Sequence, residues 1–346
     1  MTTKIIAYRA DSGACWYYRI HLPLSYLTKN NPEYEAVVAS FMDKRQIGVF
    51  DVAILQRQYR PPVLNTMLEL QEAGARLIYE IDDDLFAVPK WNPAYEVLGK
   101  RRVKFLVEKF LEKVDAVFVT TEYLATIYRP YNENIFVLPN SVSYEAFQPS
   151  PQNSIKPVIL WQGSNTHHKD LQIMAPHFTN WAAGGYLVKM WSADFPDTYK
   201  VPFVDFKDFH AMFSQMDAVV GVAPLVPNTF NRSKSNLKFL EYSAQGMVTV
   251  ASNFGPYENT ILHGETGFLV GDNREWTETV RMLVHDRNLC EKILQNAQTF
   301  VRKNFDLTKN YVLWQQAIDK VMAAPRKRTT YLPEVEKCDN MKEISV

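Results

Sequence analysis

The chain has 346 residues, of which 47% are hydrophobic, so it is long enough to bury two cores of ordinary domain size. Basic and acidic residues balance to a formal net charge of +0, which argues against a global attraction to nucleic acid or to an anionic membrane, although a local basic patch is still compatible. The three cysteines (Cys15, Cys290 and Cys338) are scattered, which indicates neither a disulfide framework nor a cysteine-based zinc site.

The chain shows no targeting pattern. Met-Thr-Thr-Lys leads directly into a predicted strand, unlike a signal peptide, and no apolar run approaches the roughly 18 residues of a membrane span. We therefore expect a soluble protein of a reducing compartment.

Short apolar runs alternate with helical patterns in the first half of the chain. Strands are predicted at residues 4–8, 35–40, 51–56, 76–81, 116–120 and 134–138, and helices at 19–29, 63–73, 95–114 and 122–128. Unbroken apolar strands separated by helices indicate a parallel sheet that is covered on both faces.

A polar segment at residues 140–156 contains two prolines and no periodicity, and we interpret it as an interdomain linker. The pattern then restarts, with strands predicted at 158–162, 186–191, 218–222, 247–251 and 267–270, and helices at 170–182, 209–216, 237–245, 275–285, 288–304 and 307–322. This predicts an α/β protein with domains at 1–145 and 146–306, a helix at 307–324 and a loosely held tail at 325–346.

The loop after the first predicted strand shows whether the chain has the glycine pattern of a dinucleotide-binding site, a common function of α/β proteins. Gly13 is its only glycine, whereas a dinucleotide fingerprint needs three at fixed spacing, so a nicotinamide or flavin oxidoreductase is disfavoured. The loop is rich in aromatic residues and ends in Tyr18 and Arg19. We interpret it as a substrate-binding lip on the acceptor side, with aromatic core packing as the alternative.

Three carboxylates, Asp82, Asp83 and Asp84, follow the predicted strand at 76–81. They lie at the carboxyl edge of the sheet, where ligands bind in open α/β folds, and their mutual repulsion is unfavourable unless donors, cations or water relieve it. We take Asp82 and Asp83 as candidate catalytic residues, as a general base or in contact with sugar hydroxyls. A metal-ligand role and a solvated helix cap are the alternatives.

The strand predicted at 158–162 leads into Gly163 and Ser164. Glycine allows a ligand to approach the backbone closely, and the serine hydroxyl can donate to phosphate. His167, His168 and Asp170 follow, but adjacent histidines point in different directions and no further ligand completes a zinc set at a recognised spacing. We therefore predict no metal here and interpret this stretch as a helix start with a hydrogen-bonding histidine.

The run from Asn231 to Gly246 is the most informative stretch of the chain. We interpret it as a polar loop, a helix that begins near Ser235 and a glycine stop, with Arg232, Lys234 and Lys238 at the helix start. Unpaired N–H groups and partial positive charge make such a place suitable for a phosphate or diphosphate. Lys238 and Glu241 share a helix face, and a carboxylate beside a cation suits a nucleotide sugar; a plain surface ion pair is the alternative.

These motifs resemble retaining nucleotide-sugar glycosyltransferases of the GT-B fold, the large family-4 group. The resemblance rests on Gly163-Ser164, on Lys238-x-x-Glu241-x-x-Ala-x-Gly246, and on the His-Gly-Glu-Thr-Gly-Phe-Leu-Val block that ends at residue 270. Val-Leu-Pro-Asn-Ser-Val at 137–142 resembles the exit from the family's first domain, and residues 304–314 resemble its closing helix.

The resemblance implies two Rossmann-like domains that face each other across a cleft, with the closing helix packed back on the first. The second domain would bind the donor and the first the acceptor, without an obligatory metal and with no cofactor besides the nucleotide-diphosphate sugar. Carried over by position, Lys238 and Arg232 would neutralise the diphosphate, Glu241 would bind the ribose, and Gly163 and Ser164 would lie against the diphosphate.

Two departures from the family pattern stand out. The family often has a glutamate eight residues before its ribose-binding glutamate, near the transferred sugar, and Ser233 occupies that position here. The family also often has histidine where Asp82–Asp84 stand, and arginine and lysine where His167, His168 and Lys169 stand. Stand-alone enzymes with this acidic variant resemble viral and bacterial accessory glycosyltransferases, some of which modify DNA bases.

The predicted function is transfer of a sugar to the hydroxyl of a glycan or small molecule with retention, in the cytoplasm (the host cytoplasm if the protein is viral). One alternative acceptor is a hydroxymethylated pyrimidine in DNA, with basic residues of the first half (Arg9, Arg19, Arg57, Arg60 and 100–104) forming a phosphate track. Another alternative is a nucleotide-sugar-binding module without turnover. No lysine placement indicates a pyridoxal cofactor.

Overall fold

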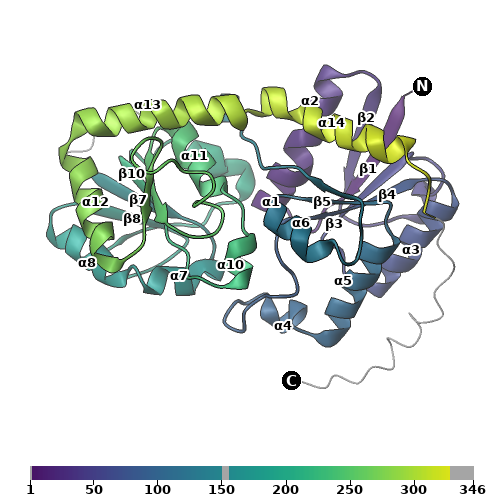
Figure 1. The fold of residues 1–346 in the computed structure, drawn as a ribbon, viewed down its shortest axis with the longest axis horizontal. Helices are drawn as coiled ribbons and strands as arrows, with labels where there is room; N and C mark the ends of the chain where they lie inside the picture. Colours follow the sequence, from purple (N-terminus) through teal and green to yellow (C-terminus); the bar gives the residue numbers. More distant parts are fainter. Residues whose placement is uncertain (1, 150–155, 328–346) are drawn as a thin grey trace. The chain divides into compact units, whose positions relative to one another are not determined.

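The computed structural model describes residues 2–149 and 156–327 (Figure 1). Cys338, the tail from residue 328 onward and residues 150–155 of the predicted linker lie outside these ranges. The chain divides into two compact units. Unit 1 comprises Met1–Pro139 and Leu307–Val346, and unit 2 comprises Asn140–Asp306.

Unit 1 is built on a parallel sheet with strand order β2-β1-β3-β4-β5-β6. The strands are β1 Thr3–Tyr8, β2 Tyr34–Ala39, β3 Val52–Gln56, β4 Arg76–Ile81, β5 Ala116–Val119 and β6 Ile135–Val137. The helices are α1 Ala14–Trp16, a π-helix Tyr17–His21, α2 Leu22–Asn30, α3 Pro61–Glu72, α4 Tyr95–Leu98, α5 Arg101–Lys113, α6 Glu122–Tyr128 and α14 Leu307–Ala323.

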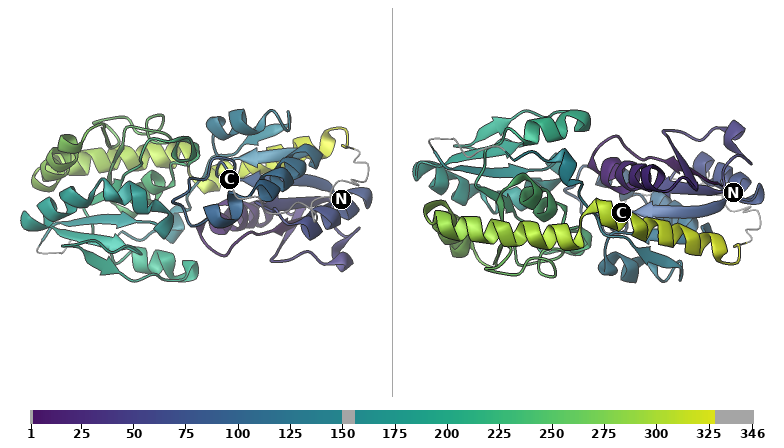
Figure 2. Two further views of the ribbon diagram at one scale, coloured as in Figure 1. Left: turned by 90° about the horizontal axis from the view of Figure 1, so that it is seen from below. Right: turned by 90° about the horizontal axis from the view of Figure 1, so that it is seen from above.

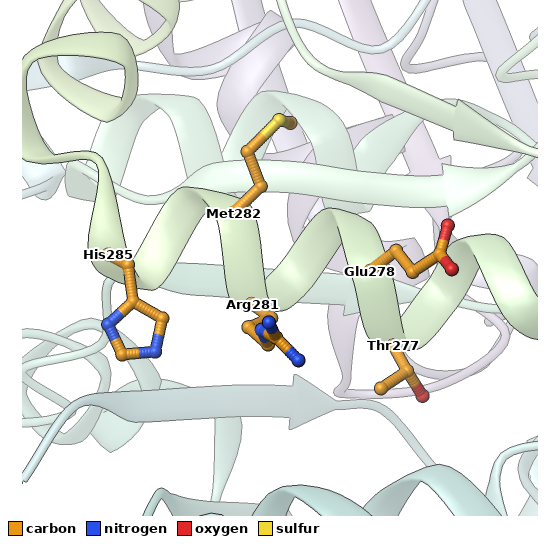
Figure 3. A pocket seen from close by; sticks show the side chains of 5 residues that line it. All are labelled: Thr277, Glu278, Arg281, Met282 and His285. Carbon is orange, nitrogen blue, oxygen red and sulfur yellow. The ribbon is translucent and has the colours of Figure 1, made fainter.

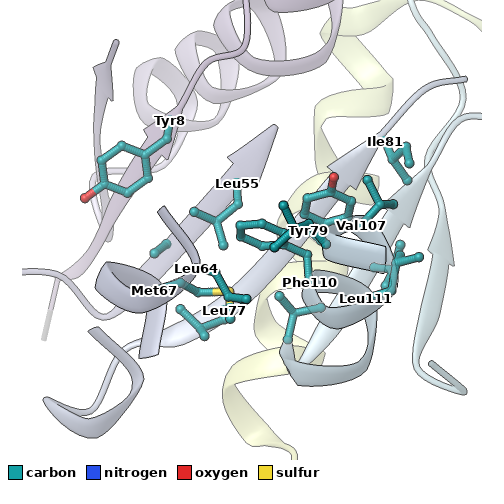
Figure 4. Close-up of a cluster of buried hydrophobic side chains, with 14 of the residues drawn as sticks. Tyr8, Leu55, Leu64, Met67, Leu77, Tyr79, Ile81, Val107, Phe110 and Leu111 are labelled. Carbon is teal, nitrogen blue, oxygen red and sulfur yellow. The ribbon is translucent and has the colours of Figure 1, made fainter. Parts of the chain in front are cut away.

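Successive strand residues of unit 1 point into two different cores. Leu55, Leu77 and Tyr79 belong to a cluster with side chains of α3 and α5 (Figure 4). Their strand neighbours, such as Ile54 and Ile78, belong to a second cluster with α2 and α14. Because both faces are covered, the central strands are mostly apolar, as in the Val-Ala-Ile-Leu-Gln of β3, which is the pattern that predicted a parallel sheet.

Unit 2 repeats this architecture with strand order β12-β11-β10-β7-β8-β9, again all parallel. Its strands are β7 Val158–Gln162, β8 Leu187–Trp191, β9 Tyr199–Val201, β10 Val220–Ala223, β11 Val248–Ser252 and β12 Phe268–Val270. Its helices are α7 His168–Gln172, α8 Ala175–Ala183, α9 Phe209–Phe213, α10 Thr229–Ser233, α11 Leu237–Gln245, α12 Asn273–His285 and α13 Arg287–Asn304. Helices flank both faces of each sheet (Figure 2).

Three predicted helices differ from the structure. The helix predicted at 170–182 is two helices, α7 and α8, because Pro176 lacks the N–H that would continue the first one. The helix predicted at 95–114 is interrupted at Lys100, which has an extended backbone. The helix predicted at 19–29 begins earlier, where the Asp11 carboxylate accepts hydrogen bonds from the backbone N–H groups of Gly13 and Trp16.

One α-helix and one β-strand of unit 2 lie where the sequence predicted neither. Residues 231–233, interpreted as polar loop, belong to α10, a short helix whose N-cap Asn228 accepts a hydrogen bond from the N–H of Asn231. The edge strand β9 is only three residues long and two of them are exposed, so it has no apolar run to reveal it.

Candidate functional site

The strand order of unit 2 reverses between β7 and β10, which are hydrogen-bonded neighbours. Ligands of open α/β sheets bind outside the carboxyl ends of the strands at such a point. Gly163 and Ser164 follow β7 there, and the loop that leads to α10 follows β10. The predicted donor-binding residues of unit 2 therefore lie on segments that leave this part of the sheet.

Helix α11, which carries Lys238 and Glu241, is held close to the sheet. A Cβ atom at Gly221 of β10 would lie 2.4 Å from the ring of Tyr242, so only glycine allows the ring to pack there. The Tyr242 hydroxyl donates to the carbonyl of Val222 (3.3 Å) and accepts from the backbone N–H of Gln162 (3.1 Å). The helix is thus fixed against the ends of β7 and β10.

Lys238 lies at the end of a chain of polar contacts. Its Nζ is 3.3 Å from Nε2 of His167, and Nδ1 of His167 is 2.8 Å from Oδ2 of Asp170. The other oxygen of Asp170 accepts from the backbone N–H of Val226 (2.8 Å) and from Nδ2 of Asn231 (2.7 Å). Asp170 is fully buried and His167 is nearly so.

Burial and neighbouring charges determine the protonation states of His167 and Lys238. Burial and the nearby Lys238 lower the pKa of His167 to about 3, although Asp170 acts in the opposite direction, so the imidazole is neutral at pH 7. Burial and the charge of Lys234 lower the pKa of Lys238 to about 8, with Glu241 and Asp170 opposing. Lys238 is therefore still protonated at pH 7.

Glu241 is 2% exposed, and Nε2 of Gln162 donates a hydrogen bond to its carboxylate. Gln162 is the last residue of β7, so a strand end orients the carboxylate predicted to bind the ribose. The sequence pattern did not single out Gln162, because a glutamine that ends an apolar strand carries no spacing signal.

The two other cations of the run, Arg232 and Lys234, each lie over an aromatic ring. Arg232 is 45% exposed by side chain, with Nη1 3.6 Å from Oε1 of Glu258 and the guanidinium 4.8 Å from the ring centroid of Phe254. Lys234 lies 4.6 Å from the ring centroid of Phe230. Ser233 is completely buried and its hydroxyl donates to the Phe230 carbonyl, so this side chain is directed into the unit.

Gly163 is partly buried and Ser164 is exposed. A Cβ atom at Gly163 would lie 2.6 Å from the ring of Trp161, so the strand exit has no space for a side chain. The exposed Ser164 hydroxyl is 2.7 Å from Oγ1 of Thr166. Both hydroxyls border the loop that leads to His167.

In unit 1, the candidate catalytic residue Asp82 is paired with Arg57, with Oδ1 3.5 Å from the guanidinium Nε; Arg57 also pairs with Asp11. Burial raises the pKa of Asp82, but Arg57 and the Cys15 thiol outweigh it, so the pKa lies below its usual value. This carboxylate is thus a weak base, better suited to accepting hydrogen bonds from hydroxyls. Asp83 is partly buried, and its carbonyl accepts from the Tyr128 hydroxyl.

The predicted acceptor-binding residues Tyr18 and Arg19 are buried, at 3% and 1% exposure. Arg19 lies 2.6 Å from Glu80, donates to the carbonyl of Leu138, and its guanidinium lies 5.3 Å from the ring centroid of Trp314. Burial raises the pKa of Glu80, while Arg19 acts in the opposite direction. This placement favours a role in holding unit 1 together, the alternative that the aromatic loop had left open.

The structure also bears on metals, membranes and other surfaces. Within residues 2–149 and 156–327, no cluster of three or more His, Cys, Asp or Glu side chains is arranged to hold a metal ion, and no helix in those ranges is long and apolar enough to cross a bilayer. A surface hollow of about 730 Å³ lies along α12, lined by Thr277, Glu278, Arg281, Met282 and His285 (Figure 3). None of the predicted site residues, all of which lie in the described ranges, lines it.

Comparison with known proteins adds a family match over part of unit 2 and a fold for the whole chain. Residues 236–300 match the family model described as "Glycosyl transferases group 1". A search of curated proteins finds no match for the chain. Among solved structures, sucrose-phosphate synthase (tll1590) from Thermosynechococcus elongatus is similar with a TM-score of 0.66 at 13% identity, covering 93% of this chain and 100% of that one.

Two further structures are similar over most of this chain. Alr3699/HepE from Anabaena, in complex with UDP-glucose, has a TM-score of 0.65 at 13% identity and covers 93% of this chain and 100% of its own. A glycosyltransferase from Rickettsia africae has a TM-score of 0.65 at 14% identity, with 94% and 100% coverage.

These findings confirm the predicted α/β fold class of two Rossmann-like domains and the predicted resemblance to GT-B glycosyltransferases. The family match includes all of α11, with Lys238 and Glu241. The protein therefore has the GT-B fold, and residues 236–300 of its second unit match the group 1 glycosyltransferase family model.

Proposed function

We propose that this protein is a glycosyltransferase that moves a sugar from a nucleoside diphosphate sugar to an acceptor hydroxyl with retention of configuration. The observation that carries the proposal is the arrangement on α11. Lys238 lies in the first turn, protonated and partly buried, and Glu241 lies one turn later, beside the carboxyl ends of β7 and β10. The complex of the structurally similar Alr3699/HepE with UDP-glucose supports this choice of donor class.

Each residue has a distinct role in this proposal. Lys238 and Arg232, with the positive end of α11, stabilise the negative charge that develops on the diphosphate as the sugar leaves. Glu241, oriented by Gln162, accepts hydrogen bonds from the ribose hydroxyls. Ser164 donates to the diphosphate, and Gly163 allows the backbone to approach it.

Unit 1 supplies the acceptor side in this proposal. Asp82 and Asp83 orient the acceptor hydroxyl, and the lowered pKa of Asp82 favours orientation over proton removal. Tyr18 and Arg19 shape the unit from inside. We also propose the cytoplasm as the compartment, in line with Cys15 and Cys290, both of which are free thiols.

The donor site can be tested by comparing binding of a nucleoside diphosphate with binding of its nucleoside. We expect Lys238→Ala to weaken binding of UDP, GDP or ADP, whichever the wild type binds, by about tenfold or more, because charge-assisted hydrogen bonds are strong. The nucleoside should bind Lys238→Ala as it binds the wild type. Glu241→Ala should weaken both ligands. Unchanged binding in both variants would remove the assigned site.

Turnover can be tested with a panel of UDP-, GDP- and ADP-sugars. Donor hydrolysis or transfer, followed by NMR of the product's anomeric centre, checks both the activity and the retention. Product formation with any donor excludes the binding module without turnover. A wild-type protein that neither binds nor hydrolyses any donor would refute the proposed function.

Several of the basic residues predicted to form a phosphate track for DNA have partners within unit 1. Of the basic residues proposed as a phosphate track, Arg19 pairs with Glu80, Arg57 pairs with Asp11 and Asp82, and Lys104 donates to the carbonyl of Phe86. We therefore expect no more than weak, salt-sensitive binding of duplex DNA in fluorescence anisotropy. Tight binding that depends on the basic residues at 100–102 would restore the hypothesis.

A further inference from the structure

Asp170 joins three segments of unit 2, two of which carry the proposed donor-binding cations Lys238 and Arg232. Through His167 it reaches Lys238 on α11, through Asn231 it holds α10, which carries Arg232, and through the N–H of Val226 it holds the loop between β10 and α10. One completely buried carboxylate thus connects segments that are 56 and 61 residues from it along the chain.

The contacts fix the tautomer of His167. A carboxylate can only accept hydrogen bonds and an ammonium group can only donate them, whereas a neutral imidazole does one at each nitrogen. With Asp170 beside Nδ1 and Lys238 beside Nε2, the proton must be on Nδ1 and the lone pair of Nε2 must face the lysine. Trp161 limits the space on the other side, with its ring centroid 6.1 Å from that of His167 and 6.0 Å from Lys238 Nζ.

We infer that His167 and Asp170 are positioning residues that hold the Lys238 ammonium, with its charge intact, for the diphosphate of the donor; the inference rests on the proposed function. A carboxylate in direct contact with Lys238 would orient it equally well but would cancel its charge. A neutral imidazole orients the lysine without forming a direct ion pair with it, so the ammonium is left to pair with the ligand. Asp170 contacts His167 and not Lys238 directly, and through that contact it sets the tautomer of the imidazole.

Binding measurements on His167 variants test this inference, with UDP, GDP and ADP as probes and the matching nucleoside as reference. His167→Phe removes the acceptor for Lys238, and we expect about tenfold weaker binding of the diphosphate with unchanged binding of the nucleoside. His167→Gln retains an acceptor and should recover part of the loss. The adjacent His168 is the matched control, because it is exposed and contacts Gln172 Nε2, so His168→Phe should bind as the wild type does.

Three outcomes would overturn the inference. His167→Phe could bind the diphosphate as tightly as the wild type does, or it could lose the nucleoside and the diphosphate equally, which would indicate a purely structural role. If the wild type binds none of the three diphosphates, the proposed function fails and this inference fails with it. If the wild type binds a diphosphate and His167→Phe binds it equally well, only the inference fails and the proposed function stands.

Nitrogen NMR of the wild-type protein provides a test that requires no ligand. With ¹⁵N-labelled histidine, and with His167→Gln to assign the signals, we expect a protonated Nδ1 and an unprotonated Nε2 at residue 167 throughout pH 6–8. Asp170→Asn should change this pattern if the variant folds, because an amide can donate to Nδ1. A protonated Nε2 at His167 in the wild type would contradict the geometry and the inference.

Discussion

At the scale of single residues, the site combines one partly buried lysine, Lys238, with charged neighbours that shift its pKa. Burial and Lys234 lower the pKa of Lys238, and Glu241 and Asp170 limit the fall, so its pKa of about 8 lies below the ordinary value for lysine, about 10.4. A group whose charge is lost at a pH this close to neutral makes ligand binding sensitive to pH. Ligand affinity should fall as pH rises, because the protonated, positively charged form of Lys238 is the one that binds a diphosphate.

We therefore expect the affinity for UDP-glucose, or for whichever nucleotide sugar binds, to be nearly constant up to about pH 7 and to fall as pH rises through 8, by about fivefold between pH 8 and pH 9. The diphosphate of a nucleotide sugar does not titrate in this range. Lys238→Arg keeps its charge and should flatten the profile, as calorimetry at several pH values can show. A fall of equal size in Lys238→Arg would assign the effect to another group.

At the scale of elements, the position of α11 depends on a strand of the same unit. The absence of a side chain at Gly221 lets the Tyr242 ring lie against β10, and the Tyr242 hydroxyl then bonds to the ends of both β7 and β10. The position of the helix that carries Lys238 and Glu241 therefore depends on the contact between Gly221 and Tyr242, neither of which is predicted to bind the ligand.

Gly221→Ala should destabilise unit 2 by about 1–3 kcal/mol, because a methyl group there meets the Tyr242 ring at 2.4 Å and forces it to move. Denaturant unfolding measures the loss. Combining Gly221→Ala with Tyr242→Leu provides the control, since the smaller side chain should accommodate the methyl group and make the two losses less than additive. Full additivity would show that the two residues do not interact as described.

At the scale of the whole molecule, the last described helix belongs to the first unit. Helix α14 packs against α2, and Trp314 lies edge-on to Phe118 with ring centroids 5.5 Å apart. Tyr34 bonds to Asp319, and Arg76 donates to the carbonyls of Met322 and Ala324. Unit 1 therefore needs chain from both ends of the described sequence to complete its second core.

Trp314→Ala should destabilise unit 1 by about 3–5 kcal/mol, as large aromatic truncations in cores do, while leaving nucleotide affinity in unit 2 unchanged. Scanning calorimetry with and without UDP, or the diphosphate that binds, can separate the units, because a ligand raises the unfolding temperature only of the unit that binds it. A single transition that both the substitution and the ligand shift together would show that the units unfold as one.

Local sequence patterns predicted most of the secondary structure. The predicted bounds of the helix at 237–245 and of the strands at 76–81 and 158–162 agree with α11, β4 and β7, because apolar periodicity and the flanking turn residues are properties of short segments. The split between α7 and α8 was missed although Pro176 lies in the sequence, and α10 was missed because Thr-Phe-Asn-Arg-Ser has no strong helix propensity.

The sequence by itself determined the two successive α/β halves and the residues at the strand ends. The tertiary structure decided which of those residues meet. Lys238 and His167 are 71 residues apart, and Arg19 and Glu80 are 61 residues apart. Such contacts depend on the order in which the strands assemble, which brings distant loops to the same sheet edge, and on burial, which no local pattern specifies. His167 lies at the start of α7 and is hydrogen-bonded, as the sequence predicted, but its contact with Lys238 and the burial of Arg19 follow only from the assembled sheets.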